Sequence, residues 1–319
     1  GILRSFLSDM PLESLTTGGS VFYFRYIFFA MGVWYLLDKN PYLSKCLLIT
    51  SFLSILVVSI DGIYQYFFEV NIFGNEKHGR DRLTGLFGDE PIIGRYVAYL
   101  SIFTFVLINQ NYEKTKITIL VSVIFLTICE VLVFLSGERA PFFSIIFFSI
   151  LIIIFIPHIR LYRLITICIS IAILFIAVLF VPHAKNRIID ETKDQLEETS
   201  LPFLPYSDHH EEHYVSALKM FEDKPIFGIG TNLFRHKCNN PEYKYKTRSC
   251  NTHPHNFYIQ LLAEQGFIGL IFLAIFYLYL SKLLIENLLY NIKSLNKKKI
   301  SIEFLPYLII LFIYWWPLI

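Results

Sequence analysis

Eight long apolar segments dominate this sequence and restrict what it can fold into. A hydrocarbon core about 30 Å thick is crossed by roughly 20 helical residues, because each residue rises about 1.5 Å. The segments come close to that length and are apolar on all sides, which is typical of helices in lipid. We therefore expect an all-α, polytopic membrane bundle with about eight spans, at 21–37, 45–60, 92–109, 117–136, 140–156, 162–181, 256–280 and 304–319.

The distribution of charge supports the same class. Charged residues make up 17% of the chain and gather between the apolar segments, whereas soluble domains average about 25%. The net charge of +2 is small and no basic stripe alternates with aromatic residues, so we expect no nucleic-acid partner. Because the chain begins with Gly1 and stops inside an apolar segment, we expect it to be part of a longer protein.

Loops rich in lysine and arginine set the orientation. They alternate with the other connecting segments, and such loops remain in the cytoplasm. These loops are 38–45, 110–116, 157–163 and 282–303. The outer side then holds 61–91, 137–139 and 182–255.

The expected domain organisation follows from this topology. Residues 1–181 form transmembrane helices with short loops, 182–254 form a large outer loop, and 255–319 return to the membrane. Within the loop, 188–199 has helical composition, 201–206 should turn because of its prolines, and Tyr214–Glu222 is typical of an amphipathic helix.

Two of the five cysteines, Cys238 and Cys250, lie in the outer loop, where disulfides persist. A disulfide would fix the chain just before His253 and His255. Two free thiols remain the alternative. A zinc site with these histidines is another, although the spacing matches no familiar zinc pattern.

The most informative stretch places His255 at the outer mouth of a membrane helix, followed by Gly266 and Gly269. Glycines at this spacing let a neighbouring helix approach closely. His255 is either a polar residue that caps the helix or a general base, because imidazole accepts a proton near neutral pH.

Three further outer stretches carry cationic candidates. Arg139 follows the short turn Ser136-Gly137-Glu138 and either reaches lipid headgroups or binds a phosphate. Arg82 begins a glycine-rich run that ends near Arg95. His210 and His213 would share one helix face, in a segment that is otherwise an ordinary solvated one.

These stretches together resemble the O-antigen ligase and polymerase superfamily of bacterial envelope glycosyltransferases. His255-Asn256, nine residues, and then Gly266-x-x-Gly269 is similar to the ligase signature. Three other matches occur in the family's order. They are Arg82–Phe87 (Arg-x-Thr-Gly-x-Phe), Ser136–Arg139 (Ser-x-x-Arg) and Lys224–Gly230 (Lys-x-Pro-x-x-Gly-x-Gly).

The resemblance implies a transferase that needs neither metal nor cofactor. Its donor would be a glycan on undecaprenyl diphosphate, at the periplasmic face of a bacterial inner membrane. The acceptor hydroxyl would belong to the lipid A core in lipopolysaccharide biosynthesis, to another lipid-linked glycan in an O-antigen polymerase, or to a protein. We lean slightly towards the ligase.

The resemblance also implies roles for residues. His255 would deprotonate the acceptor and Arg139 would bind the diphosphate. Relatives usually carry a second arginine four residues before an aromatic residue, here Tyr214, and His210 occupies that place. Because this arginine is missing, the second diphosphate ligand could be His210 itself, or His213, Arg187 or Arg82.

The rival class is a solute transporter or channel, with the intramembrane charges Arg25, Arg95 and Glu130 along a path or paired with other polar groups. A purely structural membrane protein is the third alternative. Transporters often contain inverted repeats, and none is evident in this sequence. The large polar loop beside a histidine-bearing helix favours an enzyme.

Overall fold

The computed structural model describes residues 2–16, 20–79, 82–180, 190, 193, 208–293 and 305–314. Most of the described residues are helical, and their only β-structure is the isolated bridges Val70–Glu76 and His78–Arg82. The chain divides into two compact units. Unit 1 comprises Gly1–Lys39 and Lys193–Tyr279, and unit 2 comprises Asn40–Thr192 and Leu280–Pro317. The boundaries expected at 181 and 254 follow membrane topology, whereas the two units follow packing.

Each of the eight predicted spans contains a helix, which confirms the all-α, polytopic membrane class. Among the described residues, five helices are long and apolar enough to cross a membrane: Pro11–Lys39, Tyr42–Phe68, Lys116–Leu135, Pro157–Ile176 and Phe257–Asn287. Arg139–Phe155 is a shorter apolar helix. The predicted spans at 92–109 and 304–319 correspond to helices outside this set.

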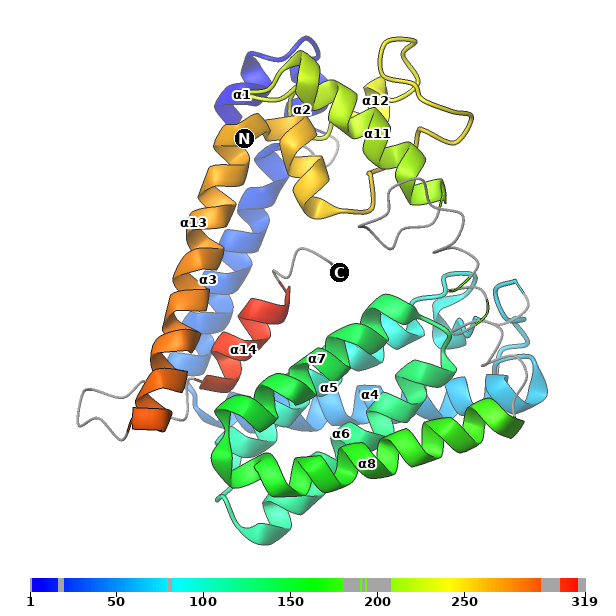
Figure 1. Ribbon diagram of the computed structural model, residues 1–319, viewed down its shortest axis with the longest axis vertical. Coiled ribbons are helices and arrows are strands. Elements are labelled where there is room, and N and C mark those ends of the chain that lie inside the picture. Colours follow the sequence, from blue (N-terminus) through cyan, green and yellow to red (C-terminus); the bar gives the residue numbers. More distant parts are fainter. Residues whose placement is uncertain are drawn as a thin grey trace. The chain divides into compact units, whose positions relative to one another are not determined.

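Unit 2 is a helical bundle (Figure 1). Its helices are α4 (Tyr42–Phe68), α5 (Ile93–Asn111), α6 (Lys116–Leu135), α7 (Arg139–Phe155), α8 (Pro157–Phe180) and α14 (Leu305–Tyr314). Helices α5, α6 and α7 supply most of its buried apolar side chains. Phe105 of α5 meets Phe148 of α7 edge to face, with ring centroids 5.7 Å apart. Such aromatic contacts add to apolar burial.

A buried ion pair crosses the bundle of unit 2. Glu130 of α6 pairs with Arg163 of α8, and both side chains are fully buried. Hydroxyl groups complete the network: Ser149 and Ser170 donate to Glu130, and Arg163 donates to Thr127 and Thr166. Glu130 therefore has a protein partner, one of the two alternatives that the sequence left open.

The start of α8 corrects one expectation. Residues 157–163 were expected to form a cytoplasmic turn, but α8 begins at Pro157. Proline suits the first helical position because its missing N–H would have no partner there. Arg160 donates to the carbonyls of Ile153 and Ile154 at the end of α7, whereas Arg163 points into the bundle.

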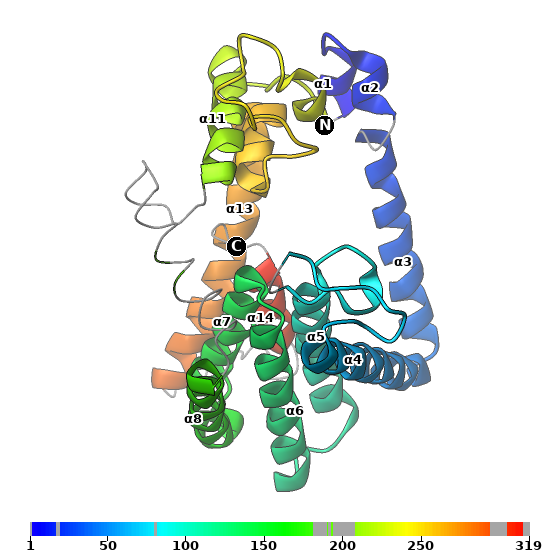
Figure 2. The same cartoon turned by 90° about the vertical axis from the view of Figure 1, so that its right-hand side faces the viewer.

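Unit 1 combines the N-terminal segment 1–39 with residues 193–279, whose helices are labelled in Figure 2. Its helices are α1 (Ile2–Phe6), α2 (Pro11–Leu15), the 3-10 turn η1 (Ser20–Tyr23), α3 (Phe24–Lys39), α11 (Asp208–Asp223), α12 (Phe234–Lys237) and most of α13 (Phe257–Lys293). Its core includes Ala217 and Met220 of α11, Phe234 of α12 and Ala263 of α13. The predicted amphipathic helix is thus α11. The predicted helix 188–199 and turn 201–206 lie outside the described residues, apart from Asp190 and Lys193.

The N-terminal segment packs on the rest of unit 1, which the sequence did not indicate. Ser14 donates to the carbonyl of Thr231 at 2.8 Å, and Arg4 donates to the carbonyl of Gly228 at 2.8 Å. Lys237 donates to Asp9, and this hydrogen bond holds the pKa of the Asp9 carboxyl below its usual range. Residues 2–16 therefore brace the loop that supports the candidate site.

Candidate active site

Four histidine rings gather in unit 1. The ring centroid of His255 lies 5.4 Å from that of His210, 5.5 Å from that of His213 and 4.3 Å from that of His253. His210 and His213 come from the first turns of α11, and His253 and His255 from the loop before α13. Three residues singled out from the sequence are thus brought together, with His253 as a fourth member.

The members of this histidine cluster differ in exposure. His255 is exposed, and His213 is buried with 6% of its surface accessible. Nδ1 of His213 is buried without a hydrogen-bond partner in the described part of the chain. A buried polar atom of this kind calls for an explanation, and a bound ligand is one.

Asn251 determines which nitrogen of the His255 ring accepts a hydrogen bond and which carries the proton. Its Oδ1 accepts from the N–H of Thr252 at 2.7 Å, so its Nδ2 faces Nε2 of His255 at 2.9 Å. An amide nitrogen only donates. Nε2 of His255 is therefore the acceptor, and the neutral ring carries its proton on Nδ1. Asn251 was not among the site residues expected from the sequence, although its place next to Cys250 was a usable signal.

The backbone at His255 is left-handed, with φ of 63°. This conformation costs a non-glycine residue about 1–3 kcal/mol, so its surroundings must hold it. Asn256 does so from one side, because its side-chain oxygen accepts from the N–H groups of Tyr258 and Ile259 and caps α13. The buried Pro254 stands on the other side.

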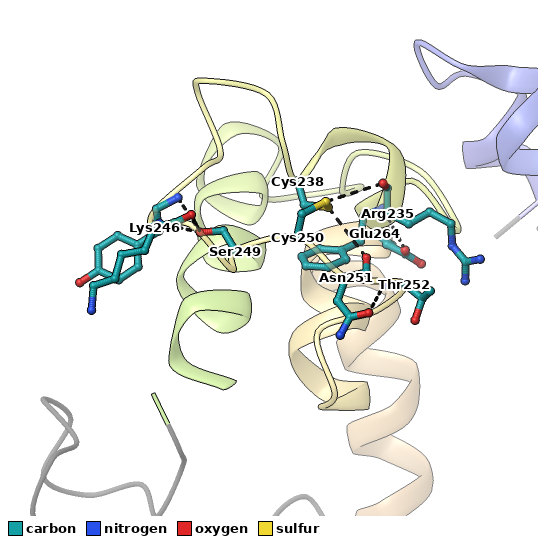
Figure 3. Close-up of a disulfide and its surroundings, with 10 residues drawn as sticks. Arg235, Cys238, Lys246, Ser249, Cys250, Asn251, Thr252 and Glu264 are labelled. Carbon is teal, nitrogen blue, oxygen red and sulfur yellow. Dashed lines mark hydrogen bonds between the residues drawn. A yellow bond between two sulfur atoms is a disulfide. The ribbon is translucent and has the colours of Figure 1, made fainter. Parts of the chain in front are cut away.

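A disulfide links Cys238 to Cys250, with Cα atoms 4.9 Å apart. Cys238 is buried in the core of unit 1, directly after α12. Figure 3 shows that Asn251 and Thr252 follow the bridge at once. The disulfide therefore ties the loop that bears His255 to the core.

Helix α13 is broken at Gly266, whose φ of 66° and ψ of −162° are not helical; its ribbon changes direction near this point (Figure 1). The loop Lys224–Gly230 satisfies the backbone groups that the break leaves free. Ile229 and Gly230 donate to the carbonyls of Ala263 and Glu264, and Phe267 donates to the carbonyl of Pro225. These hydrogen bonds thus hold together the two stretches that resemble the family, Lys224–Gly230 and His255–Gly269.

This arrangement corrects the role expected for Gly266. A Cβ atom on Gly266 would overlap the carbonyl of Ile226, and one on Gly228 would overlap the backbone of Glu264. A Cβ on Gly269 would meet Gln265 of the same helix. Gly266 and Gly228 thus permit a helix–loop contact and a break. At Gly266 the backbone of 225–226 occupies the space in which a neighbouring helix was expected, and the expectation for Gly269 stays a prediction.

Glu264 lies beneath the loop and is almost fully buried. Its carboxylate accepts from the N–H of Asn232 at 2.9 Å and of Phe234 at 3.3 Å. Gln265 next to it donates to the hydroxyl of Thr231. The first part of α13 is therefore joined to the start of α12 through polar contacts that the sequence did not reveal.

In unit 2, the run Arg82–Phe87 is held by the end of α4. Gln65 accepts from the N–H groups of Thr84 and Gly85, both at 2.9 Å, and donates to the Thr84 hydroxyl at 3.0 Å. Helix α4 extends past the predicted end of its span at residue 60 because these contacts engage its last turns. Arg82 donates to the carbonyl of Pro91 at 3.2 Å.

The turn before Arg139 lies beside this run. The N–H of Leu83 donates to the carbonyl of Ser136 at 3.3 Å, and Glu138 accepts from the N–H of Gly94 at 2.6 Å. Burial raises the pKa of the Glu138 carboxyl, against the hydrogen bond from Gly94 and the charge of Arg82. Arg139 begins α7 and is partly exposed. Arg82 and Arg139 are thus at the same end of unit 2.

The remaining candidates lie elsewhere. Arg25 is exposed and donates to the hydroxyl of Tyr26, and Arg95 is exposed on α5. Arg187 lies outside the described residues. In the described ranges, no group of three or more His, Cys, Asp or Glu residues has an arrangement that could hold a metal ion. A cavity of about 410 Å³ in unit 2 lies at the far end of α5, next to Lys114 and His158.

Fold and site together define a polytopic helical membrane protein with a cluster of histidines where a membrane helix begins. Residues 120–274 match the family model described as O-antigen ligase. The match includes Arg139, the histidine cluster and the break in α13. This match supports the resemblance to the O-antigen ligase and polymerase superfamily that the motifs indicated. A comparison with curated proteins gives no match.

Proposed function

We propose that this protein transfers a glycan from undecaprenyl diphosphate to an acceptor hydroxyl at the periplasmic face of a bacterial inner membrane. The observation that carries the proposal is the cluster of His210, His213 and His253 around His255. It provides a base and additional groups that can bind an anion within one compact unit. The match of residues 120–274 to the O-antigen ligase family model supports the transferase class.

In the proposed reaction, Nε2 of His255 takes the proton of the acceptor hydroxyl. The acceptor oxygen forms a bond to the anomeric carbon of the donor sugar. The bond from that carbon to the diphosphate oxygen breaks, and its electron pair leaves with undecaprenyl diphosphate. Because Asn251 donates to Nε2 in the structure, the acceptor hydroxyl must replace Asn251 there.

The diphosphate needs positive charge or hydrogen-bond donors, because it leaves with additional negative charge. We assign Arg139 this role, since guanidinium binds phosphate oxygens with two parallel hydrogen bonds and keeps its charge. His210 and His213 are the second ligands beside His255, and the unpartnered Nδ1 of His213 supports their assignment. Arg82 is the further candidate within unit 2. No metal or cofactor has a part in this proposal.

The acceptor is the lipid A core in our first proposal, which makes the protein a ligase. An O-antigen polymerase would carry out the same chemistry on the end of another lipid-linked glycan. The two are distinguished by supplying purified protein with lipid-linked glycan and each acceptor in turn. A chelator in parallel reactions tests metal independence, because loss of transfer with the chelator would contradict it.

The base assignment is tested by His255→Ala in the full-length protein in vesicles. General bases typically contribute about 10²–10⁴-fold to a rate, so transfer should fall by about that factor. His236→Ala is the matched control, because His236 is an exposed histidine of the same unit outside the cluster. Transfer by His255→Ala at the rate of His236→Ala would remove the base assignment.

A further inference from the structure

The loop that supports the break in α13 exposes two large apolar side chains. Ile226 is 58% exposed and Phe227 is 57% exposed, whereas Gly228, Ile229 and Gly230 directly after them are buried. We call Ile226 and Phe227 the apolar tip. The same short loop thus buries one isoleucine in the core of unit 1 and turns two apolar residues outwards.

Backbone hydrogen bonds fix the tip beside the membrane helix. Phe267 donates to the carbonyl of Pro225 at 2.9 Å, and Ile268 donates to the carbonyl of Ile226 at 3.3 Å. The tip is therefore level with the first turn of α13 after the break. Phe267 is itself 51% exposed and meets Phe221 of α11 edge to face, with ring centroids 4.9 Å apart.

The exposed apolar surface continues from this point along α13. Ile271, Phe272 and Ile275 are exposed on the next turns, within a helix that is long and apolar enough to cross a membrane. Side chains of this kind face hydrocarbon, since large apolar patches are uncommon on surfaces in water. The tip is continuous with this lipid-facing surface.

Lys224 adds a charged boundary. It is exposed and stands two residues before the tip. Lysine next to exposed aliphatic and aromatic residues is typical of segments at the membrane interface, where the ammonium group meets lipid phosphates. The loop thus presents a cation and then two apolar side chains in chain order.

We infer that the apolar tip inserts into the bilayer leaflet from which α13 enters the membrane. Its partner is the acyl region of the phospholipids, with Lys224 at their phosphates. The contact gives the histidine-bearing part of unit 1 a second attachment to the membrane besides α13. This inference does not depend on the catalytic roles proposed above.

The test uses the full chain with Cys46, Cys129 and Cys168 replaced by serine, so that the disulfide is kept. Phe227→Cys is labelled with an environment-sensitive fluorophore, and the protein is reconstituted in vesicles of phosphatidylcholine and phosphatidylglycerol. Lipids with a nitroxide on the acyl chain quench fluorophores that lie in the bilayer. Phe272→Cys marks a lipid-facing position, and Glu242→Cys marks an exposed polar position of the same unit.

We expect the label at Phe227 to be quenched by the nitroxide lipids nearly as strongly as that at Phe272, with blue-shifted emission. The label at Glu242 should respond to iodide in the water instead. Equal lipid quenching at Phe227 and Glu242 would overturn the inference. A Phe227 label protected from both quenchers would also overturn it, because a protein surface would then cover the tip. Ile226→Cys serves as an independent second position.

Discussion

Asn251 donates a hydrogen bond from Nδ2 to Nε2 of His255 across 2.9 Å, while its own oxygen accepts from the N–H of Thr252. The amide cannot turn over without losing that second bond. The contact therefore fixes both the orientation and the tautomer of the His255 ring. It also places a neutral donor on the nitrogen that the proposed reaction uses as base.

Asn251 is thus a positioning residue, and its substitution tests the orientation of the base. Asn251 orders the ring before the acceptor hydroxyl replaces it at Nε2. We therefore expect Asn251→Ala to lower transfer roughly two- to tenfold, the equivalent of one net hydrogen bond of about 0.5–1.5 kcal/mol that no longer orders the ring. Asn251→Asp should be worse below neutral pH. A carboxylate stabilises the protonated ring, so the acid limb of the pH–rate profile should move to higher pH. Unchanged profiles in both variants would contradict the positioning role.

His210 occupies the place where relatives usually carry an arginine, which suggests a test of diphosphate binding. An imidazole loses its charge above about pH 6.5, whereas guanidinium keeps it. We expect His210→Arg to retain a low KM for the lipid-linked donor at pH 8.5, and His210→Ala to raise it at all pH values. His236→Arg introduces the same charge at an exposed site. If His236→Arg lowers the KM at pH 8.5 as much as His210→Arg does, general electrostatic attraction explains the effect and His210 is not a ligand.

The disulfide Cys238–Cys250 closes a short loop directly before Asn251. Bridges that close about 15 residues contribute roughly 3 kcal/mol in the chain-entropy model. We expect Cys238→Ser with Cys250→Ser to expose residues 238–255 to limited proteolysis and to reduce transfer, with the membrane helices still intact. Replacing Cys46, Cys129 and Cys168, which are unpaired, should have neither effect. Resistance of the double variant equal to that of the parent would show that the loop holds its shape without the bridge.

The membrane helices could be predicted because their length and composition are set by the bilayer and need no knowledge of contacts. Their ends could not. Helix α4 runs on to Phe68 because Gln65 binds Thr84 and Gly85, and such a partner is invisible in a local pattern. Arg163 shows the same limit. Its charge suggested a cytoplasmic loop, and only the packing of α6 against α8 provides Glu130 for it.

The histidine cluster was within reach of the sequence in part. His210 and His213 share a helix face by their spacing, and His255 stands in a family-like motif. The packing of residues 2–16 against the loop at Gly228 could not be predicted, because Arg4 and Gly228 are separated by 224 positions. A contact of that separation leaves no periodic signal in a single sequence.

Gly266 and Gly228 provide a test of the break in α13. Alanine at either position must adopt a positive φ and place its Cβ on an opposing backbone. The strained conformation alone costs about 1–3 kcal/mol, and the overlap adds to it. We expect both variants to loosen unit 1 in limited proteolysis. Gly32→Ala is the control, since an added Cβ meets nothing within 4 Å there. Two variants as resistant as the control would contradict the tight helix–loop contact.

The buried ion pair of Glu130 and Arg163 lets us predict how substitutions of either residue change the stability of unit 2. Removing one partner leaves the other charge buried, which typically costs about 3–5 kcal/mol. Glu130→Leu and Arg163→Met should therefore each lower the unfolding temperature in detergent substantially. The double variant should be more stable than either single variant, because apolar residues of similar volume can replace a buried pair at little cost. A transport path through Glu130 would demand a different pattern, with loss of function in the double variant at preserved stability. Destabilisations that simply add in the double variant would show that the two side chains act independently.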